Sequence, residues 1–371
     1  MSKTLQDYAT LINDTIQSNE VNHYITTDNM CQNLGGIDTF KNINIPQGKV
    51  RSFQKDDILL SNIRLYFRKV YRAKQKGGCS SDVLVFRAKH IDSAALFAIL
   101  SSQIFTDYAC SGSQGSKMPR GNKTHMMDFK IPTINFTIAK IFNSIQNKIE
   151  NNHKINELLH KILELLYKQY FVRFDFLDEN NKPYQTSGGK MKFSKELNRL
   201  IPNDFEVKTL GELTQLKVGN KNANHSSNQG KYSFFTCSNN PLRCETYQFE
   251  GKHIIISGNG NFHVTHYDGK FDAYQRTYVV NPNNPNHYVL IYLFVKSYTN
   301  YLKLQSRGSI IKFITKSDIE NIKIVLPNLK TYTKWNNVLK MIENNNQSTQ
   351  TLTVLRDFLL PLLLTQQVKP K

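Results

Sequence analysis

The tetrapeptide IENN occupies residues 149–152 and recurs at residues 342–345, a separation of 193 residues. Two Gly-Ser pairs lie at the same separation, one in SGSQGSKMPR (residues 111–120) and one in LQSRGSIIKF (residues 304–313). Unrelated strings that repeat at one interval indicate that a long segment is duplicated. The interval is far longer than a solenoid repeat, so it predicts two whole domains built alike.

Shorter matches support the duplication. DILLSN from Asp57 resembles HIIISGN from His253, VLVF from Val83 resembles TYVV from Thr277, and FKIP (129–132) resembles IVLP (324–327). In each copy, β-rich runs precede an apolar helical segment, a Gly-Ser stretch, a short segment ending in Pro and a long helix. The order predicts an α+β protein with two similar mixed α/β domains related by a pseudo-twofold internal repeat.

Two long helices follow the two copies. Apolar residues recur at nearly heptad spacing between Thr133 and Gln169 and again after Pro327, each time around a polar centre. One such stripe is typical of an ordinary core helix. Two matched stripes of about 36 residues, about 54 Å each, predict an antiparallel coiled coil that separates two domains. Leu360-Pro361 predicts a kink or the end of the second helix. The predicted seams are Ile138, Ile141, Ile145, Ile155, Leu159, Ile162 and Leu166, and Trp335, Val338, Ile342, Leu352, Leu355, Leu359 and Leu362.

The charge of the chain favours a polyanionic partner. Its 371 residues include 48 Lys and Arg against 29 Asp and Glu, a formal charge of +19 that is spread along the sequence. A generally basic, Lys- and Asn-rich proteome is the alternative explanation. The length fits two or three domains, and the 39% hydrophobic content is enough to build cores.

Cysteine usage and hydropathy predict a cytoplasmic protein with no membrane segment. The five cysteines are scattered and form no Cys-x-x-Cys pair, which favours a reducing compartment and argues against structural zinc. The first residues lack the apolar core of a signal peptide, and no window approaches 18 uninterrupted apolar residues.

Motifs for chemistry are absent from the sequence. There is no Pro-Pro pair for the catalytic loop of an adenine methyltransferase, and SGNGNF lacks the order of a cofactor-binding glycine loop. His263 and His266 in HVTH have no third metal ligand at a suitable spacing. We therefore expect a non-catalytic chain with no cofactor and no metal of its own.

Several motifs together resemble the specificity subunits of type I restriction-modification systems. YITTDNM, DILLSNIRLYFRKVYRA and GGCSSDVLVF look like the opening of a target recognition domain. The stretch from Tyr170 to Leu213, with IPNDFE and LGEL, resembles the central conserved region of that family, and LRDFLLPLLL resembles its usual ending. The final TQQVKPK departs from the family's small-residue ending.

The resemblance implies a reader of double-stranded DNA that is not an enzyme. In that family each recognition domain binds one half of a split target, and paired helices fix the gap and dock two methyltransferase subunits. A helix of about 54 Å exceeds one DNA turn of about 34 Å. S-adenosylmethionine, ATP and Mg²⁺ are then expected on partner subunits, the last two on restriction/translocase subunits. The expected parts are 1–132 (first recognition domain), 133–170 (first spacer helix), 171–204 (connecting region), 205–327 (second recognition domain) and 328–371 (second helix and tail).

Candidate DNA contacts lie in the Gly-Ser stretches and beside the matched strands. Small residues let a backbone approach phosphates or base edges, Gln114 suits adenine, and Arg307 suits guanine or phosphate. A flexible linker or a solvated hairpin remains the alternative for each stretch. The full set is Asn62, Arg64, Arg68, Lys69, Ser113, Gln114, Lys117, Arg120, Lys221, Asn259, Asn261, His263, Arg276, Arg307, Ser309 and Lys312.

Three other functions fit the sequence less well. One is the subunit of a related system whose partner fuses methyltransferase and nuclease. Another is a self-sufficient nuclease with an unrecognised site, and the third is a scaffold that has lost DNA binding. Neither the target bases nor the spacer length follows from the sequence, because base readout is partly indirect.

Overall fold

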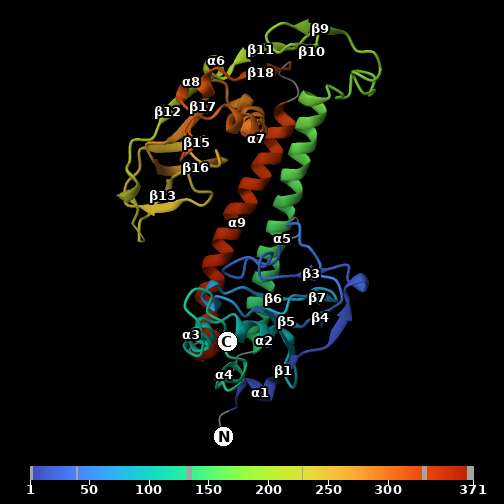
Figure 1. Cartoon of the computed structure of the whole chain (residues 1–371), viewed down its shortest axis with the longest axis vertical. Coiled ribbons are helices and arrows are strands. Elements are labelled where there is room, and N and C mark those ends of the chain that lie inside the picture. Colours follow the sequence, from blue (N-terminus) through green and yellow to red (C-terminus); the bar gives the residue numbers. More distant parts are fainter. Residues whose placement is uncertain (1–2, 39–40, 132–135, 228, 328–331, 366–371) are drawn as a thin grey trace. The chain divides into compact units, whose positions relative to one another are not determined.

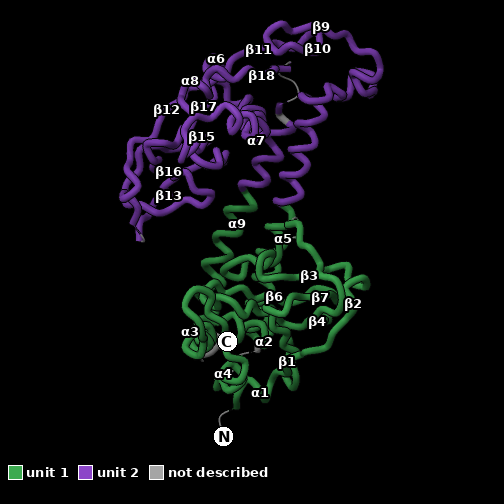
Figure 2. The backbone as a smooth tube through the Cα atoms, in the orientation of Figure 1, with its two compact units in different colours: residues 1–155, 344–371 green, residues 156–343 purple. Residues whose placement is uncertain are grey.

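The computed structural model describes residues 3–38, 41–131, 136–227, 229–327 and 332–365. The chain divides into two compact units (Figure 2). Unit 1 comprises Met1–Ile155 with Asn344–Lys371, and unit 2 comprises Asn156–Glu343. Two long helices, α5 (Phe136–Tyr167) and α9 (Tyr332–Thr365), each contribute one part to each unit (Figure 1).

Unit 1 is built on two four-stranded sheets. The first has the order β1-β8-β5-β6, formed antiparallel by β1 (Ala9–Ile12), β8 (Val83–Ala88), β5 (Ile58–Ser61) and β6 (Val70–Arg72). Helix α2 (Ser93–Leu100) buries seven of its eight side chains in the core of this unit, where Phe97 lies 5.6 Å from the Phe142 ring of α5. The second sheet consists of β2 (Thr15–Gln17), β4 (Lys49–Phe53), β7 (Gly77–Cys79) and β3 (Tyr24–Ile25).

Unit 2 is built on a six-stranded sheet in the order β12-β17-β15-β16-β13-β14. Helix α7 (Tyr288–Gln305) packs its apolar first half into the core of this unit. Two antiparallel two-stranded sheets complete the unit: the hairpin of β9 (Met191–Ser194) with β10 (Arg199–Pro202), and the pair of β11 (Glu206–Thr209) with the distant β18 (Lys323–Leu326). The sheet strands are β12 (Thr214–Val218), β13 (Tyr232–Phe235), β14 (Leu242–Cys244), β15 (Phe249–Ser257), β16 (Val264–Ala273) and β17 (Thr277–Pro282).

The two units repeat one four-stranded arrangement, so the prediction of an α+β fold with two similar domains is confirmed. In sheet order, β1, β8, β5 and β6 of unit 1 correspond to β12, β17, β15 and β16 of unit 2. DILLSN and HIIISGN fall on β5 and β15, and VLVF and TYVV fall on β8 and β17. The shared alternation of apolar residues therefore marks strands that occupy the same place in each sheet.

Each copy also begins with the same short helix, which the sequence analysis did not identify. In α1 (Leu5–Tyr8), Thr4 and Asp7 form a capping box, and in α6 (Leu210–Leu213) Thr209 and Glu212 form another. The leucine that follows each N-cap threonine donates its main-chain N–H to a carbonyl near the end of the same copy. Leu5 donates to the Phe129 carbonyl and Leu210 to the Ile322 carbonyl, both at 2.8 Å. The start and the end of each copy therefore lie together.

The two copies differ in the helix that follows their sheet strands, which is one continuous helix, α7, in unit 2 and two helices in unit 1. The counterpart of α7 in unit 1 is interrupted at Ser101 and Ser102 and continues as α3 (Gln103–Ser111). The Ser102 hydroxyl accepts from the N–H of Phe105 at 3.1 Å, as an N-capping serine does. A side chain that satisfies the free N–H groups of a new first turn stabilises the break.

The seam of the long helices is half as predicted. Ile138 and Ile145 are buried in α5, and Trp335 and Ile342 in α9. The predicted Leu159, Leu166 and Val338 are half-buried and pack against the core of unit 2. Four other predicted residues are exposed beside a buried neighbour: Ile141, Ile155 and Ile162 beside Phe142, Asn156 and Leu163 in α5, and Leu355 beside Arg356 in α9. The prediction missed these positions because it counted apolar residues only, whereas several buried seam positions are polar.

Those polar side chains are hydrogen-bonded within each unit. In unit 1 the Asn152 amide donates to the Thr349 hydroxyl at 3.1 Å, and Arg356 donates to Gln146 Oε1 at 3.2 Å. In unit 2 the Asn156 amide donates to the Ile342 carbonyl at 3.3 Å. Lower numbers in α5 pair with higher numbers in α9, so the helices run antiparallel in each unit.

The described helices extend almost as predicted. Helix α5 ends at Tyr167 and continues as a π-helical turn, Lys168–Val172, while α9 passes through Pro361 and ends at Thr365. The predicted end of the second helix at Pro361 is therefore wrong. A proline there costs one main-chain hydrogen bond, which is cheap in the last turn. The predicted helix starts at residues 133 and 328, and the tail after Thr365, lie outside the described residues. The predicted domain boundaries remain predictions.

No helix among the described residues combines the length and the apolar character needed to cross a bilayer.

Candidate nucleic-acid interface

The Gly-Ser stretch of unit 1 is a closed loop. Gln114 and Arg120 exchange two main-chain hydrogen bonds, of 2.9 and 2.8 Å, across the five residues between them. Gly115 has a φ of +99°, a conformation that residues with a Cβ rarely adopt. The stretch is therefore a defined turn that needs its glycine, and not the flexible linker that was the alternative interpretation.

Unit 2 contains the same loop. Arg307 and Phe313 exchange main-chain hydrogen bonds of 3.0 and 2.8 Å, and Gly308 has a φ of +100°. A Cβ on Gly308 would lie 2.3 Å from the carbonyl oxygen of Ile311, which is too close for any other residue. We call residues 114–120 and 307–313 the clasp loops.

Both clasp loops are fastened to the end of the equivalent strand. In unit 1 the N–H of Arg64 donates to the Pro119 carbonyl at 2.9 Å, and Gly121 donates to the Asn62 carbonyl at 3.1 Å. In unit 2 the matching bonds join Gly260 to Lys312 at 2.9 Å and Ile314 to Gly258 at 2.9 Å. These main-chain bonds fasten each loop to the strand end without using the loop side chains.

In each clasp loop, one arginine is oriented by an ion pair with a carboxylate. Arg120 pairs with Asp82 at 3.0 Å and Arg307 pairs with Asp318 at 3.1 Å, and both guanidinium side chains remain 62% exposed. The Asp318 carboxylate also accepts hydrogen bonds from the main-chain N–H and the hydroxyl of Thr315. Burial raises the pKa of this carboxyl, but the hydrogen bonds from Thr315 and the charge of Arg307 outweigh burial and lower the pKa below its usual value. The arginines are oriented while most of their surface stays free.

The clasp loops carry six of the sixteen predicted contact residues. Gln114, Lys117, Arg120, Arg307, Ser309 and Lys312 are all exposed there, and Ser113 is half-buried at the start of the first loop. Beside the second loop, Asn259 forms a bridge with Phe313, and Gly258 donates to the Arg276 carbonyl at 2.7 Å. The exposed Asn261 and Arg276, and the partly exposed Lys221 that bridges to Tyr274, lie on the same end of the unit 2 sheet.

Other predicted residues are turned toward the protein. Asn62 is buried, Arg68 donates to the Ser101 carbonyl at 2.9 Å, and the Lys69 ammonium donates to the Thr27 carbonyl. Burial lowers the pKa values of Arg68 and Lys69, and it does the same for the half-buried His263. Arg64 contacts the Lys117 carbonyl of the first clasp loop at 3.4 Å. These side chains are placed to shape the loops.

Exposed apolar side chains at the loop tips were not predicted. Met118 is 55% exposed in the first loop, and Ile310 and Ile311 are 94% and 61% exposed in the second. Side chains of this kind contact thymine methyl groups or wedge between base steps. The signal was present in the sequence, since an apolar residue follows each Gly-Ser pair within three positions.

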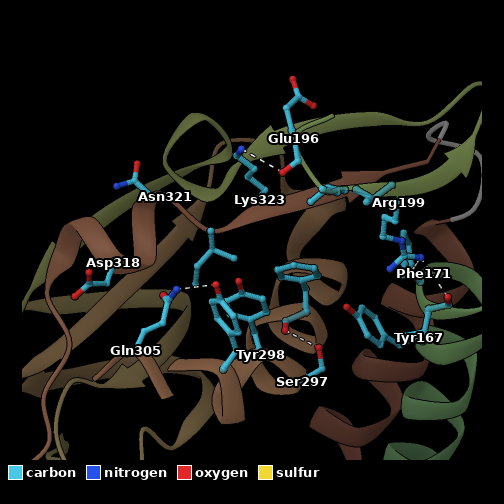
Figure 3. Close-up of a pocket in the computed structure, with 16 residues that line it drawn as sticks. Tyr167, Phe171, Glu196, Arg199, Ser297, Tyr298, Gln305, Asp318, Asn321 and Lys323 are labelled. Atoms are coloured by element: carbon cyan, nitrogen blue, oxygen red, sulfur yellow. Dashed lines mark hydrogen bonds between the residues drawn. The ribbon is translucent and has the colours of Figure 1, made fainter. Parts of the chain in front are cut away.

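A cleft of about 620 Å³ lies elsewhere in unit 2, between α7, α8 (Lys316–Glu320), the end of α5 and the β9-β10 hairpin (Figure 3). Its aromatic residues include Tyr167 and Tyr298, and Arg199 donates to the carbonyls of Phe171 and Val172 at 3.3 and 3.2 Å. Gln305 donates to the Tyr301 hydroxyl at 2.6 Å. These polar groups are hydrogen-bonded to other groups of the protein. The residues that line the cleft include neither cysteine nor histidine.

Comparison with known proteins identifies similar proteins of one family. Residues 202–354 match the family described as the type I restriction modification DNA specificity domain. The chain is 36% identical over 132 residues to the type I restriction enzyme EcoDI specificity subunit of Escherichia coli. It is similar to the type I specificity subunits. That match covers 34% of this chain and 28% of the E. coli protein.

A second relative spans more of the chain. The MjaIX specificity subunit of Methanocaldococcus jannaschii is 24% identical over 306 residues, which cover 74% of this chain and 68% of the archaeal protein. The S subunit of a type I system from M. genitalium has a similar fold, with a TM-score of 0.60 at 17% identity over 99% of this chain and 96% of that one. The family resemblance stated from the sequence motifs is confirmed.

Proposed function

We propose that this chain is a specificity subunit, a non-catalytic DNA reader that recognises a bipartite target, with one clasp loop directed at each half. The observation that carries the proposal is the repetition of one loop, held by the same main-chain hydrogen bonds, in both units. Each copy presents an oriented, mostly exposed arginine. Arginine is the side chain best suited to guanine and to phosphate.

The side chains on the two loops predict that the two half-targets differ. The first loop presents Gln114, Lys117 and Arg120, whereas the second presents Arg307, Lys312 and two isoleucines. Amide, cationic and apolar groups favour different base edges. A target with two unlike halves follows from this difference.

The remaining parts of the complex are proposed from the family. Two methyltransferase subunits, which bring S-adenosylmethionine, dock on the long helices, and restriction/translocase subunits bring ATP and Mg²⁺. The length of the paired helices sets the number of base pairs between the half-targets. The formal charge of +19 supports binding to the duplex.

Modified-base sequencing of the source genome, with and without this gene, tests the proposal. We expect one bipartite N6-methyladenine motif to disappear when the gene is deleted. Replacing residues 205–327 with the matching segment of another specificity subunit should then change one half of the motif and leave the other. An unchanged methylation pattern after deletion, or a change in both halves after the exchange, contradicts the proposal.

A further inference from the structure

Three side chains that are far apart in the sequence meet in unit 2, near the β14 edge of its six-stranded sheet. His225 Nε2, the Cys244 sulfur and a carboxylate oxygen of Asp272 all lie within 4.8 Å of one another. His225 comes from a short 3-10 turn, Ala223–His225, Cys244 ends β14, and Asp272 lies on β16. Imidazole, thiolate and carboxylate are the ligand types that Zn²⁺ uses in proteins.

The sheet itself brings two of these residues to one face. Strand β13 lies between β14 and β16, with Tyr232 opposite Cys244 and Phe234 opposite Asp272. Tyr232 and Phe234 are two positions apart, so their partners project on the same side of the sheet. The Phe234 ring stands edge-on to the His225 imidazole, with centroids 5.3 Å apart, and fixes the position of the third residue.

The Asp272 carboxylate has one oxygen that lacks a binding partner in the part of the chain that the structure describes. Asp272 is completely buried, and its Oδ2 accepts from the Thr246 hydroxyl at 2.6 Å and lies 3.0 Å from His225 Nε2. Its other oxygen, Oδ1, has no hydrogen-bond donor among the described residues. A buried carboxylate with an unsatisfied oxygen is costly unless a cation or a donor serves it.

We propose that His225, Cys244 and Asp272 bind one Zn²⁺ ion. The sulfur and nitrogen ligands favour Zn²⁺ over Mg²⁺ or Ca²⁺, which prefer oxygen ligands. Binding displaces the proton of the Cys244 thiol, which leaves to solvent, so the two anionic ligands balance the charge of the ion. Thr246 orients the carboxylate as a supporting hydrogen-bond donor.

The ion would tie a surface segment to the sheet. His225 lies on the stretch that connects β12 to β13 and carries Lys221, one of the predicted DNA contacts. Ser227 of the same stretch donates to the Arg243 carbonyl at 2.8 Å, next to Cys244. The proposed site differs from the expectation that scattered cysteines argue against zinc, because its residues are brought together by strand pairing and not by spacing in the sequence.

Metal content and cobalt spectroscopy of the purified full chain test the proposal. We expect one Zn²⁺ per chain after dialysis against micromolar Zn²⁺, and an S-to-Co²⁺ charge-transfer band when Co²⁺ replaces it. Cys244→Ser should abolish the band and the bound metal. Cys79→Ser, which removes the other buried cysteine, should keep both.

A second variant keeps the test decisive where Cys244→Ser fails to fold. A chain with Cys31, Cys79, Cys110 and Cys237 all changed to serine retains Cys244 as its only thiol. It must still show the cobalt band, and Asp272→Asn in that background must weaken Co²⁺ binding at least tenfold. A folded wild-type chain that binds no Zn²⁺, or binding unaffected by His225→Gln and Asp272→Asn, overturns the site. None of these readouts involves DNA.

Discussion

Arg120 and Phe313 occupy the same position in two copies of one loop. Each closes its clasp loop by a pair of main-chain hydrogen bonds, to Gln114 and to Arg307 respectively. One is a cation that pairs with Asp82 and the other is a half-buried ring, so the loop geometry does not depend on the side chain at this position. Because main-chain hydrogen bonds determine the loop conformation, the two copies can carry different side chains on the same loop.

The loop glycines should be essential to different degrees. Alanine at Gly115 or Gly308 must adopt a φ near +100°, a strain of roughly 1–3 kcal/mol. Only at Gly308 does the new Cβ also meet a carbonyl oxygen at 2.3 Å. We expect Gly115→Ala to weaken binding to the bipartite duplex by about tenfold, and Gly308→Ala by more. The measurement is the dissociation constant of each variant at one salt concentration.

Gly251 provides the matched control for this comparison. It has a φ of +96° on β15, and a Cβ there would meet no atom within 4 Å. Gly251→Ala should therefore lose stability and retain its affinity for DNA. Equal affinity of Gly308→Ala and the wild-type chain would show that the second clasp loop does not contact the duplex.

Removing one loop arginine should change how binding depends on salt. If Arg307 neutralises one phosphate, Arg307→Ala reduces the slope of log affinity against log salt by about 1. If it reads a guanine, affinity falls by about 1–3 kcal/mol for the native target and little for other sequences. Arg173→Ala removes an equally exposed arginine from the connecting region and should alter neither quantity. Identical curves for all three proteins argue against a role for Arg307.

The buried arginine of α9 should be important for the stability of unit 1. Arg356 is 2% exposed and donates to Gln146 Oε1 and to the Asn33 carbonyl, at 3.2 and 3.3 Å. Arg356→Ala leaves buried acceptors without donors, at a cost of about 2–3 kcal/mol in the free energy of unfolding. Urea unfolding measures this directly. Val354→Ala, two positions away and 72% exposed in the wild type, should stay within about 0.5 kcal/mol.

Acid should destabilise unit 2 through His266. Burial lowers the pKa of His266 to about 3, helped by His160, Lys252 and Lys296, while its ring packs 4.9 Å from that of Tyr292. Glu343, 3.7 Å from the imidazole, already pairs with Lys252 at 2.8 Å.

The pH window follows from these values. Between the unfolded pKa of about 6.5 and about 3, the unfolded chain binds a proton that the folded chain does not, so stability falls as pH falls. The expected slope is roughly 1 kcal/mol per pH unit across that range. His266→Gln should flatten the dependence relative to the wild type. The same slope in both proteins would rule out His266 as its source.

The duplication could be predicted because it survives as short strings at one interval. The pairs DILLSN with HIIISGN and VLVF with TYVV mark strands whose apolar pattern is required by the same place in a sheet. The capping helices were missed, although TLQD and TLGE carry the same cap, because α1 and α6 are only four residues long. Very short helices lack the apolar periodicity on which the prediction relied.

The helix seam and the sites mark where prediction from sequence fails. Asn152, Asn156 and Arg356 occupy seam positions as hydrogen-bonded polar residues, and the apolar Ile141 and Ile162 outside the seam shifted the predicted register by one. The candidate contacts in the clasp loops are exposed, and their role in binding DNA stays a prediction. The inward direction of Arg68 and Lys69 follows only from the fold, since nothing in SNIRLYFRK shows which carbonyls lie within reach.

The bond between Asn152 and Thr349 also determines when unit 1 can finish folding. Its two partners are 197 residues apart, and Leu360 of the same helix completes the core around Phe142. During synthesis α5 must wait, with its apolar face unpaired, until nearly all of unit 2 has left the ribosome and α9 follows. Contacts of such long range form slowly, so the newly made chain passes through a prolonged, aggregation-prone stage before the two helices meet.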